Sequence, residues 1–212
     1  MKTAYIVKAY RTAVGKAPKG VFRFKRTDEL AAETIKYMMD ELPNFDKTRI
    51  DDVIVGNAMP EGSQGLNMGR LISLMGLDIV DVPGVTVNRF CSSGLETIGM
   101  ATAKIQAGMA DCIIAGGAES MSAVPMTGFK PELNYDLVNA GHEEYYWGMG
   151  NTAEAVANQF KVSREDQDEF AYNSHMKALK AQAENRFQDQ IVPINVAQTY
   201  IDGNGKKATK SY

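Results

Sequence analysis

Hydrophobic positions along the first 120 residues alternate between two patterns, one typical of buried strands and one of amphipathic helices. The predicted elements are a strand over 3–9, a helix over 27–42, a strand over 51–57, a helix over 67–75 that Gly76 ends, a strand over 85–90, a helix from Ser92 to about Met109, and a strand over 111–115. Apolar stripes are expected on the first of these helices at Leu30, Ala31, Thr34, Ile35, Met38 and Leu42, and on the third at Leu95, Ile98, Thr102 and Ile105. Strands separated by helices predict an α/β fold in three layers, with a largely parallel sheet flanked by helices.

Beyond residue 120 the pattern changes. Residues 121–147 are rich in Pro, Gly, Asn and aromatic residues without a clear period, and two polar helices are predicted after them. Capping-box spacings start these helices at Asn151, with Glu154, and at Ser163, with Asp166; the helices reach Phe160 and about Phe187. Residues 191–201 resemble an edge strand, and a turn at 202–205 is followed by no predicted strand or helix. We therefore divide the chain into segments 1–120 and 121–212.

Composition places the chain among globular proteins. It has 212 residues, 44% of them hydrophobic, and 23 basic against 26 acidic residues give a net charge of −3 without a charged run. Nucleic acid is therefore not an expected partner, although the basic stretch over 16–26 could be either a solvated loop or an anion-binding patch. No apolar run approaches the roughly 20 residues that span a bilayer, and no signal peptide is evident, so we expect a cytoplasmic protein without membrane contact.

Cys91 is the strongest candidate for a catalytic residue. It lies where a predicted buried strand turns directly into a helix beginning Ser92-Ser93-Gly94. The first turn of a helix offers unpaired N–H groups and the positive end of the dipole, which favour a thiolate and can stabilise an oxyanion. Gly94 leaves room for a substrate to approach. The alternative for Cys91 is an ordinary buried cysteine.

The remaining candidates for chemistry are weaker. Cys112 lies in an apolar strand and is interpreted as a core residue, and the two cysteines have no zinc-site spacing. His142, in an irregular segment, and His175, in a polar helix, are the only possible imidazole bases. A Gly-x-Gly-x-x-Ala pattern begins at Gly148, but no apolar strand precedes it. We interpret that stretch as a loop leading into a capped helix rather than as a dinucleotide site.

Several motifs together resemble the thiolase family. The two most specific are VNRFCSSGLE at 87–96 and AGGAESMS at 115–122, and the spacing between them also matches. Further support comes from RTAVG at 11–15, GLNMGR at 65–70, MGNTAE at 149–154 and SREDQD at 163–168. The sequence around Cys91 looks more like that of degradative 3-ketoacyl-CoA thiolases than like that of the acetoacetyl-CoA-forming branch.

The resemblance implies an acyl-CoA C-acyltransferase. The residue that matches Cys91 attacks a 3-ketoacyl-CoA and becomes acylated, and coenzyme A, as co-substrate, or an acetyl-CoA enolate then takes the acyl group. No tightly bound cofactor is implied. Residues 1–120 match the first of two similar α/β halves, and 121–212 match the start of an inserted CoA-binding loop domain. There Met149 matches either a lining residue of the pantetheine channel or a packing residue.

The chain also departs from the family, whose members are about twice this long and assemble as dimers or as tetramers of dimers. Their second half carries an activating histidine, an asparagine that positions an oxyanion-hole water, and a second cysteine that acts as acid and base. None has a counterpart here, so we expect a truncated chain that is nearly inactive alone and associates through an uncovered face. Two other hypotheses stay open: a non-catalytic acyl-CoA-binding module that pairs with a separate chain, and a cysteine hydrolase with His142 as base.

Overall fold

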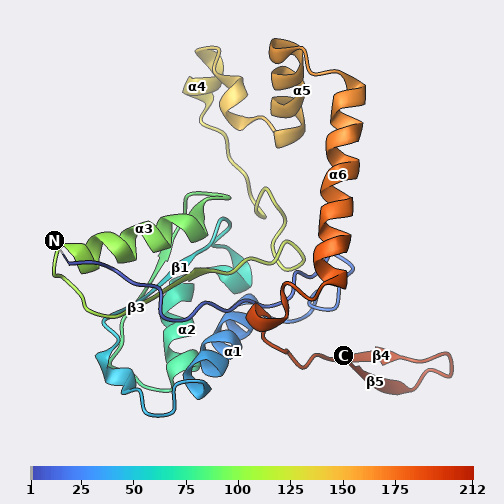
Figure 1. Ribbon diagram of the computed structural model, residues 1–212. Coiled ribbons are helices and arrows are strands. Elements are labelled where there is room, and N and C mark those ends of the chain that lie inside the picture. The colour runs from blue at the N-terminus through green and yellow to red at the C-terminus, as the bar shows by residue number, and fades with distance from the viewer. Residues whose placement is uncertain (1) are drawn as a thin grey trace. The chain divides into compact units, whose positions relative to one another are not determined.

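The computed structural model describes residues 2–212, which form two compact units (Figure 1). One unit contains the residues up to Phe129 together with Gln190–Tyr212, and the other contains Lys130–Asp189. The first unit holds a parallel sheet between helices, which confirms the predicted α/β class. The sequence-based division at residue 120 stays a prediction.

The sheet of the first unit has three strands, and every pairing in it is parallel. β1 (Asp52–Gly56) is the central strand, and β2 (Gly84–Val87) and β3 (Ile113–Gly117) flank it in the order β2-β1-β3. In this register Gly56 of β1 lies beside Val87 and Gly117. The carboxyl ends of all three strands therefore meet at one edge, where the segment with Cys91 begins.

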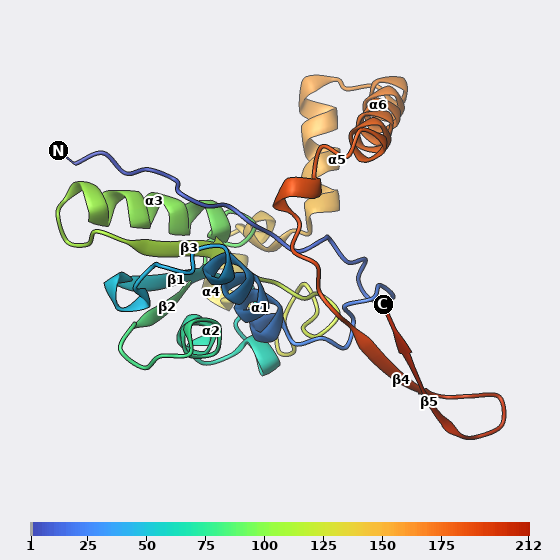
Figure 2. The same cartoon turned by 60° about the horizontal axis from the view of Figure 1, so that its bottom comes forward.

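Helices cover both faces of this sheet (Figure 2). α1 (Thr27–Asp40) and α2 (Met68–Leu77) pack together on one face, and α3 (Ser93–Gln106) lies on the other. The main apolar core forms between the sheet and the first two helices, from Ile35, Met39, Ile50, Val53, Val55, Met68, Ile72, Leu77 and Val82. The alternation of predicted strands and helices along the sequence indicated this arrangement, and the burial of Val53, Ile54 and Val55 fits a central strand covered on both faces.

α3 packs on the sheet through its small residues rather than through its apolar stripe. Ser93, Thr97 and Ala101 are buried, whereas Leu95 is 73% exposed and Ile98 is 43% exposed. Thr97 Oγ1 donates to the Gly116 carbonyl at 3.1 Å, so this polar side chain is satisfied within the contact. Small side chains let the helix backbone approach the sheet closely, and that approach leaves the larger residues facing outward.

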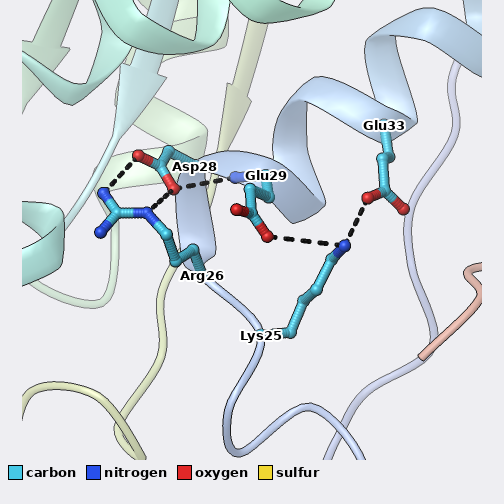
Figure 3. A network of polar contacts seen from close by, with 5 residues as sticks. All are labelled: Lys25, Arg26, Asp28, Glu29 and Glu33. Carbon is cyan, nitrogen blue, oxygen red and sulfur yellow. Dashed lines mark hydrogen bonds and ion pairs between the residues drawn. The ribbon is translucent and has the colours of Figure 1, made fainter. Parts of the chain in front are cut away.

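The ends of α1 and α2 depend on local polar contacts. Asn67 caps α2 by accepting from the Arg70 N–H at 3.4 Å, and Asp78 ends the helix in a left-handed conformation with φ of 58°. The helix therefore continues through Gly76, where we predicted its end. At the start of α1, Arg26 forms two hydrogen bonds to buried Asp28, of 3.0 and 2.7 Å (Figure 3).

Lys25, just before α1, pairs with carboxylates on the first turns of that helix (Figure 3). Its Nζ atom lies 2.5 Å from Glu33 Oε1 and 3.5 Å from Glu29 Oε2. The hydrogen bond to Glu33 raises the pKa of Lys25 above its usual value. These contacts hold the entry to α1 against the helix.

The predicted first strand is absent. Residues 3–9 form no strand pairing within the described chain, and Tyr5, Ile6 and Val7 are each about 80% exposed. Lys2 pairs with Asp111 at 2.7 Å. An apolar, β-branched run predicts a strand only where a sheet edge receives it, because its backbone groups need a neighbouring ladder. The strand prediction for 3–9 is therefore wrong for this structure.

The second unit is helical. It contains α4 (Tyr135–Asn139), α5 (Met149–Phe160) and α6 (Arg164–Ala183), with a 3₁₀ turn over Glu143–Tyr146. Ser163 and Asp166 form the predicted capping box at the start of α6. Asn151 does not cap α5, because the helix already begins at Met149 after Gly148, and Asn151 lies inside its first turn. In the described part of the chain, no helix is both long and apolar enough to cross a membrane.

The end of the chain forms a hairpin that the sequence only half predicted. β4 (Ala197–Ile201) pairs antiparallel with β5 (Lys207–Ser211) across the predicted turn at 202–205. The absence of a strand after the turn was therefore a wrong expectation, since short polar strands carry little hydrophobic signal. Buried Gln198 donates to the Val21 carbonyl at 2.7 Å and anchors the hairpin to its own unit. Further 3₁₀ turns cover Lys47–Arg49, Gly62–Gln64 and Gln188–Gln190.

The Asp51 carboxylate stabilises the fold in a way that depends on pH. Its Oδ2 accepts the N–H groups of Asp111 and Cys112 at 2.7 and 3.1 Å, which joins the start of β1 to β3 and lowers the pKa of Asp51. Because the pKa of Asp51 is lower in the folded state, its contribution to stability is fully present above the pKa of the unfolded state, about 4. The contribution disappears as the pH falls through the pKa of the folded state. Because the side chain is exposed, we expect a contribution of only a few tenths of a kcal/mol.

Urea unfolding at a series of pH values below 5 checks this prediction. The Asp51→Asn variant should lose part of the acid-induced decrease in the free energy of unfolding that the unmodified chain shows. Asp81→Asn is the control, because Asp81 is exposed and its carboxylate accepts no hydrogen bond from the described residues. An identical pH dependence in the chain and in Asp51→Asn would contradict the prediction.

Candidate active site

Cys91 lies in a sharp turn between a strand and a helix. β2 ends at Val87 and α3 begins at Ser93, so the thiol stands near the helix N-terminus, as predicted. The cysteine is exposed rather than buried, which removes the alternative of an ordinary core cysteine. The residue before it, Phe90, has a φ of 45°, in the left-handed region that non-glycine residues adopt at a cost. Such a turn needs contacts that hold it in place.

Two polar side chains hold the turn. Asn88 Oδ1 accepts from the Phe90 N–H at 2.8 Å, while Asn88 Nδ2 donates to the Ala58 carbonyl at 3.0 Å. Ser93 Oγ accepts from the Arg89 N–H at 2.9 Å and donates to the Phe90 carbonyl at 2.6 Å, and Ser93 is buried. The N–H and the carbonyl of Phe90 are therefore both hydrogen-bonded, which fixes the backbone beside Cys91.

Glycines bring the start of α3 directly onto the strand ends. A Cβ atom placed on Gly56 would lie 2.6 Å from the Ser93 carbonyl oxygen and 2.7 Å from the Gly94 nitrogen. One placed on Gly117 would lie 3.3 Å from the Gly94 Cα atom. Both glycine positions therefore exist to let backbone touch backbone. Gly117, in the motif at 115–122, thus supports the turn with Cys91. Together with Gly56 it places the N-terminus of α3 at the carboxyl ends of the strands.

The second cysteine is in a different setting. Cys112 is half-buried at the start of β3, where burial, and secondarily the charge of Asp51, raise the pKa of its thiol. A raised pKa leaves less of the nucleophilic thiolate at neutral pH. The structure therefore supports the interpretation of Cys112 as a packing residue.

The other predicted site residues belong to the second unit. Met149 is the first residue of α5 and is 66% exposed. The His142 ring stacks on Tyr145 with centroids 5.0 Å apart, and its Nδ1 atom lies 3.4 Å from Glu144 Oε1. His175 lies on exposed α6. All three lie outside the unit that contains Cys91, so a role for Met149 and the His142 hydrolase hypothesis stay predictions.

A dinucleotide site and a metal centre lack structural support. The segment before Gly148 is a 3₁₀ turn, Glu143–Tyr146, rather than the strand that a dinucleotide-binding unit requires. Within residues 2–212, no group of three or more His, Cys, Asp or Glu side chains could hold a metal ion.

Sequence reasoning missed a polar network at the same edge of the sheet. Buried Gln64 and the carboxylate of Glu119 bond to each other, and each also holds a backbone group near the carboxyl end of β1. Buried Asn57 donates to the Ala118 carbonyl at 2.9 Å from the same edge. The only signal in the sequence was the presence of Glu119 in the motif at 115–122, because Gln64 is far from it in the chain.

The sequence of this chain is similar to a known protein family and to several of its members. A family model described as the thiolase N-terminal domain matches residues 4–209. The 3-ketoacyl-CoA thiolase of Bacillus subtilis is 49% identical over 213 residues, which cover 100% of this chain and 54% of that protein. The beta-ketoadipyl-CoA thiolase of Acinetobacter baylyi is 39% identical, over 93% of this chain and 53% of that protein.

A solved structure is similar as well. The crystal structure of the Bacillus anthracis acetyl-CoA acetyltransferase superimposes with a TM-score of 0.73 and 30% sequence identity, covering 97% of this chain and 53% of that one. The chain thus spans about half the length of the curated relatives it matches.

Proposed function

The chain belongs to the thiolase family, and from this premise we propose that it carries the acyl-accepting half of an acyl-CoA C-acyltransferase, with Cys91 as the nucleophile. One observation carries the proposal: Cys91 is exposed in a turn at the N-terminus of α3, and the N–H and carbonyl of the preceding Phe90 are both hydrogen-bonded. A helix N-terminus favours a thiolate, and a fixed backbone holds its sulfur in one place for attack.

The proposed reaction has two transfers. The Cys91 sulfur attacks the keto carbonyl of a 3-ketoacyl-CoA, the carbon–carbon bond beside it breaks, and the acyl group stays on sulfur while acetyl-CoA leaves after taking a proton. The sulfur of coenzyme A then attacks this thioester, which releases acyl-CoA and returns the Cys91 thiol. N–H groups at the start of α3 are suited to stabilise the oxyanion of either attack. Coenzyme A acts as a co-substrate, and we propose no tightly bound cofactor.

A general base and a general acid are needed for the proton transfers, and each contributes about 10²–10⁴-fold to a rate. No histidine lies in the unit that contains Cys91, among the residues that the structure describes. We therefore propose that these 212 residues alone accept an acyl group slowly and do not turn over. Met149, at the exposed start of α5, is proposed as a contact for the pantetheine arm.

Intact mass spectrometry after incubation with acetoacetyl-CoA tests the proposal. We expect a fraction of the chain to gain one acetyl group, mapped by peptide analysis to Cys91. Formation of the adduct also separates this proposal from the non-catalytic alternative, in which acetoacetyl-CoA binds without covalent transfer. Calorimetric binding without any adduct would favour that acyl-CoA-binding module and contradict the proposal.

A cytoplasmic location of the protein stays a prediction.

The exposed stripe of α3 predicts that the chain associates with itself. Leu95 and Ile98 face solvent on the outer side of this helix, and exposed apolar surface of this kind is normally covered by another surface. Sedimentation velocity should detect oligomers or aggregates of the unmodified chain and a several-fold smaller associated fraction in the double variant Leu95→Glu, Ile98→Glu.

The control for this measurement is Val80→Glu, which adds charge at an apolar residue that is exposed outside α3. It should leave the associated fraction unchanged. Equal association of all three proteins would show that the α3 stripe is not the contact surface.

A further inference from the structure

Glu119 follows β3 in the motif at 115–122, and its carboxylate is held on both sides. Its Oε2 atom accepts from the Ala58 N–H at 2.6 Å, and its Oε1 atom accepts from Gln64 Nε2 at 2.6 Å. Both neighbours are donors, so both carboxylate oxygens are required as acceptors. Glu119 thereby joins the loop after β3 to the loop after β1.

The Gln64 side chain can bond Glu119 in only one orientation. Gln64 is fully buried, and its Oε1 atom accepts from Thr27 Oγ1 at 2.8 Å and from the Ser120 N–H at 2.6 Å. Its Nε2 atom donates to the Met59 carbonyl at 3.0 Å as well as to Glu119. A rotated amide would place donors against donors on one side, so the network fixes the amide and presents an N–H to Glu119.

From Ala58 the contacts continue to the turn with Cys91. The Ala58 carbonyl accepts from Asn88 Nδ2 at 3.0 Å, and Asn88 Oδ1 accepts from the Phe90 N–H at 2.8 Å. Phe90 is the residue with left-handed backbone that precedes Cys91. The position of the nucleophile thus depends on Ala58, and the position of Ala58 depends on Glu119.

We propose that Glu119 is a positioning residue for Cys91, acting through Ala58 and Asn88 to hold the thiol at the N-terminus of α3. This inference rests on the proposed role of Cys91 and adds a residue that touches no reacting atom. It also gives the motif at 115–122 a second task beside the glycine contacts: Gly117 admits the helix, and Glu119 sets the turn in front of it.

The substitution Glu119→Gln tests the proposal with almost no change in shape. A carboxamide has one acceptor oxygen, so its NH₂ group must face either the Ala58 N–H or Gln64 Nε2. Hydrogen bonds to charged groups are among the stronger ones, and the reactive form of a cysteine is the thiolate. We expect alkylation of Cys91 by iodoacetamide at pH 7 to slow about tenfold, while alkylation of Cys112 keeps its rate.

A matched control is Glu61→Gln. Glu61 Oε2 also accepts a backbone N–H, that of Phe129, at 2.6 Å, but within the described structure its carboxylate forms no hydrogen bond to Ala58 or Asn88. This variant should alkylate at Cys91 within twofold of the rate of the unmodified chain. Cys112 provides an internal reference in every sample, because its slow alkylation reports that the unit is folded.

The alkylation rates of Cys91 and Cys112 decide the proposal. A slower rate at Cys91 with an unchanged rate at Cys112 supports it, and an unchanged rate at Cys91 overturns it. If Glu119→Gln makes Cys112 react faster, the unit has loosened, and the variant Asn88→Ala, which cuts the same path at an exposed residue, then decides: a slower rate at Cys91 with an unchanged rate at Cys112 supports the proposal, and an unchanged rate at Cys91 overturns it. Alkylation requires no acyl-CoA, so failure of the acyl-transfer proposal appears separately, as a missing acetyl adduct on the unmodified chain.

Discussion

Replacing Gly56 by alanine is expected to destabilise the first compact unit by about 3 kcal/mol, at the upper end of the usual range for overpacking. Its added methyl carbon would lie 2.6 Å from the Ser93 carbonyl oxygen and 2.7 Å from the Gly94 nitrogen, both of them backbone atoms. Backbone cannot rotate away as a side chain tip can, so α3 must move off the sheet or β1 must bend. Native proteins have only about 5–15 kcal/mol of stability, so this loss is large.

The same displacement would disturb the nucleophile. Ser93 carries the hydroxyl that bonds Arg89 and Phe90, so movement of its backbone loosens the turn that contains Cys91. We therefore expect Gly56→Ala to slow alkylation of Cys91 in molecules that remain folded. The stability of the unit and the reactivity of Cys91 therefore depend on the same contact, because Gly56 both lets α3 approach the sheet and places the N-terminus of that helix.

Urea unfolding followed by circular dichroism, with the alkylation rate as a second readout, measures both effects. Gly99→Ala is the matched control: Gly99 lies within α3, and a Cβ atom there meets nothing within 4 Å. It should be as stable as the unmodified chain or more stable by up to about 1 kcal/mol, because alanine favours a helix over glycine. If Gly56→Ala and Gly99→Ala unfold at the same urea concentration, the close approach of α3 is not a constraint.

Replacing Cys91 by alanine is expected to abolish the acetyl adduct that acetoacetyl-CoA forms on the chain. The loss should be complete rather than partial, since the adduct is a bond to the deleted sulfur. An exposed side chain in an already fixed turn contributes little to packing, so the free energy of unfolding should stay within about 0.5 kcal/mol of that of the unmodified chain. The result would separate chemistry from folding at this position.

The companion variant is Cys112→Ala, measured by intact mass and peptide mapping under the same conditions. Cys112 is half-buried with a raised pKa, so its removal should leave the adduct on Cys91 intact. Its stability cost should be larger than that of Cys91→Ala, because the side chain packs against the main core. An adduct that persists in Cys91→Ala and disappears in Cys112→Ala would reverse the assignment of the nucleophile.

Local signals in the sequence were sufficient for elements whose causes are local. The capping box at Ser163, the amphipathic helix over 27–42 and the alternation that predicted a parallel sheet all involve neighbours within a few residues, and the structure confirms them. Cys91 could be found in the same way, because a strand that turns into a helix at Ser92-Ser93-Gly94 places a cysteine at a helix N-terminus whatever surrounds it.

Tertiary structure decided where distant residues meet. Residues 3–9 have the composition of a strand but lack a ladder in the described chain, because strand formation needs a neighbouring edge. The buried face of α3 is its small-residue face, because Gly56 and Gly117, distant in sequence, admit the helix backbone rather than large side chains. Glu119 is connected to the turn with Cys91 through Ala58 and Asn88 only in three dimensions, since its bond to Ala58 and that of Asn88 to Ala58 join loops that the sheet brings to one edge.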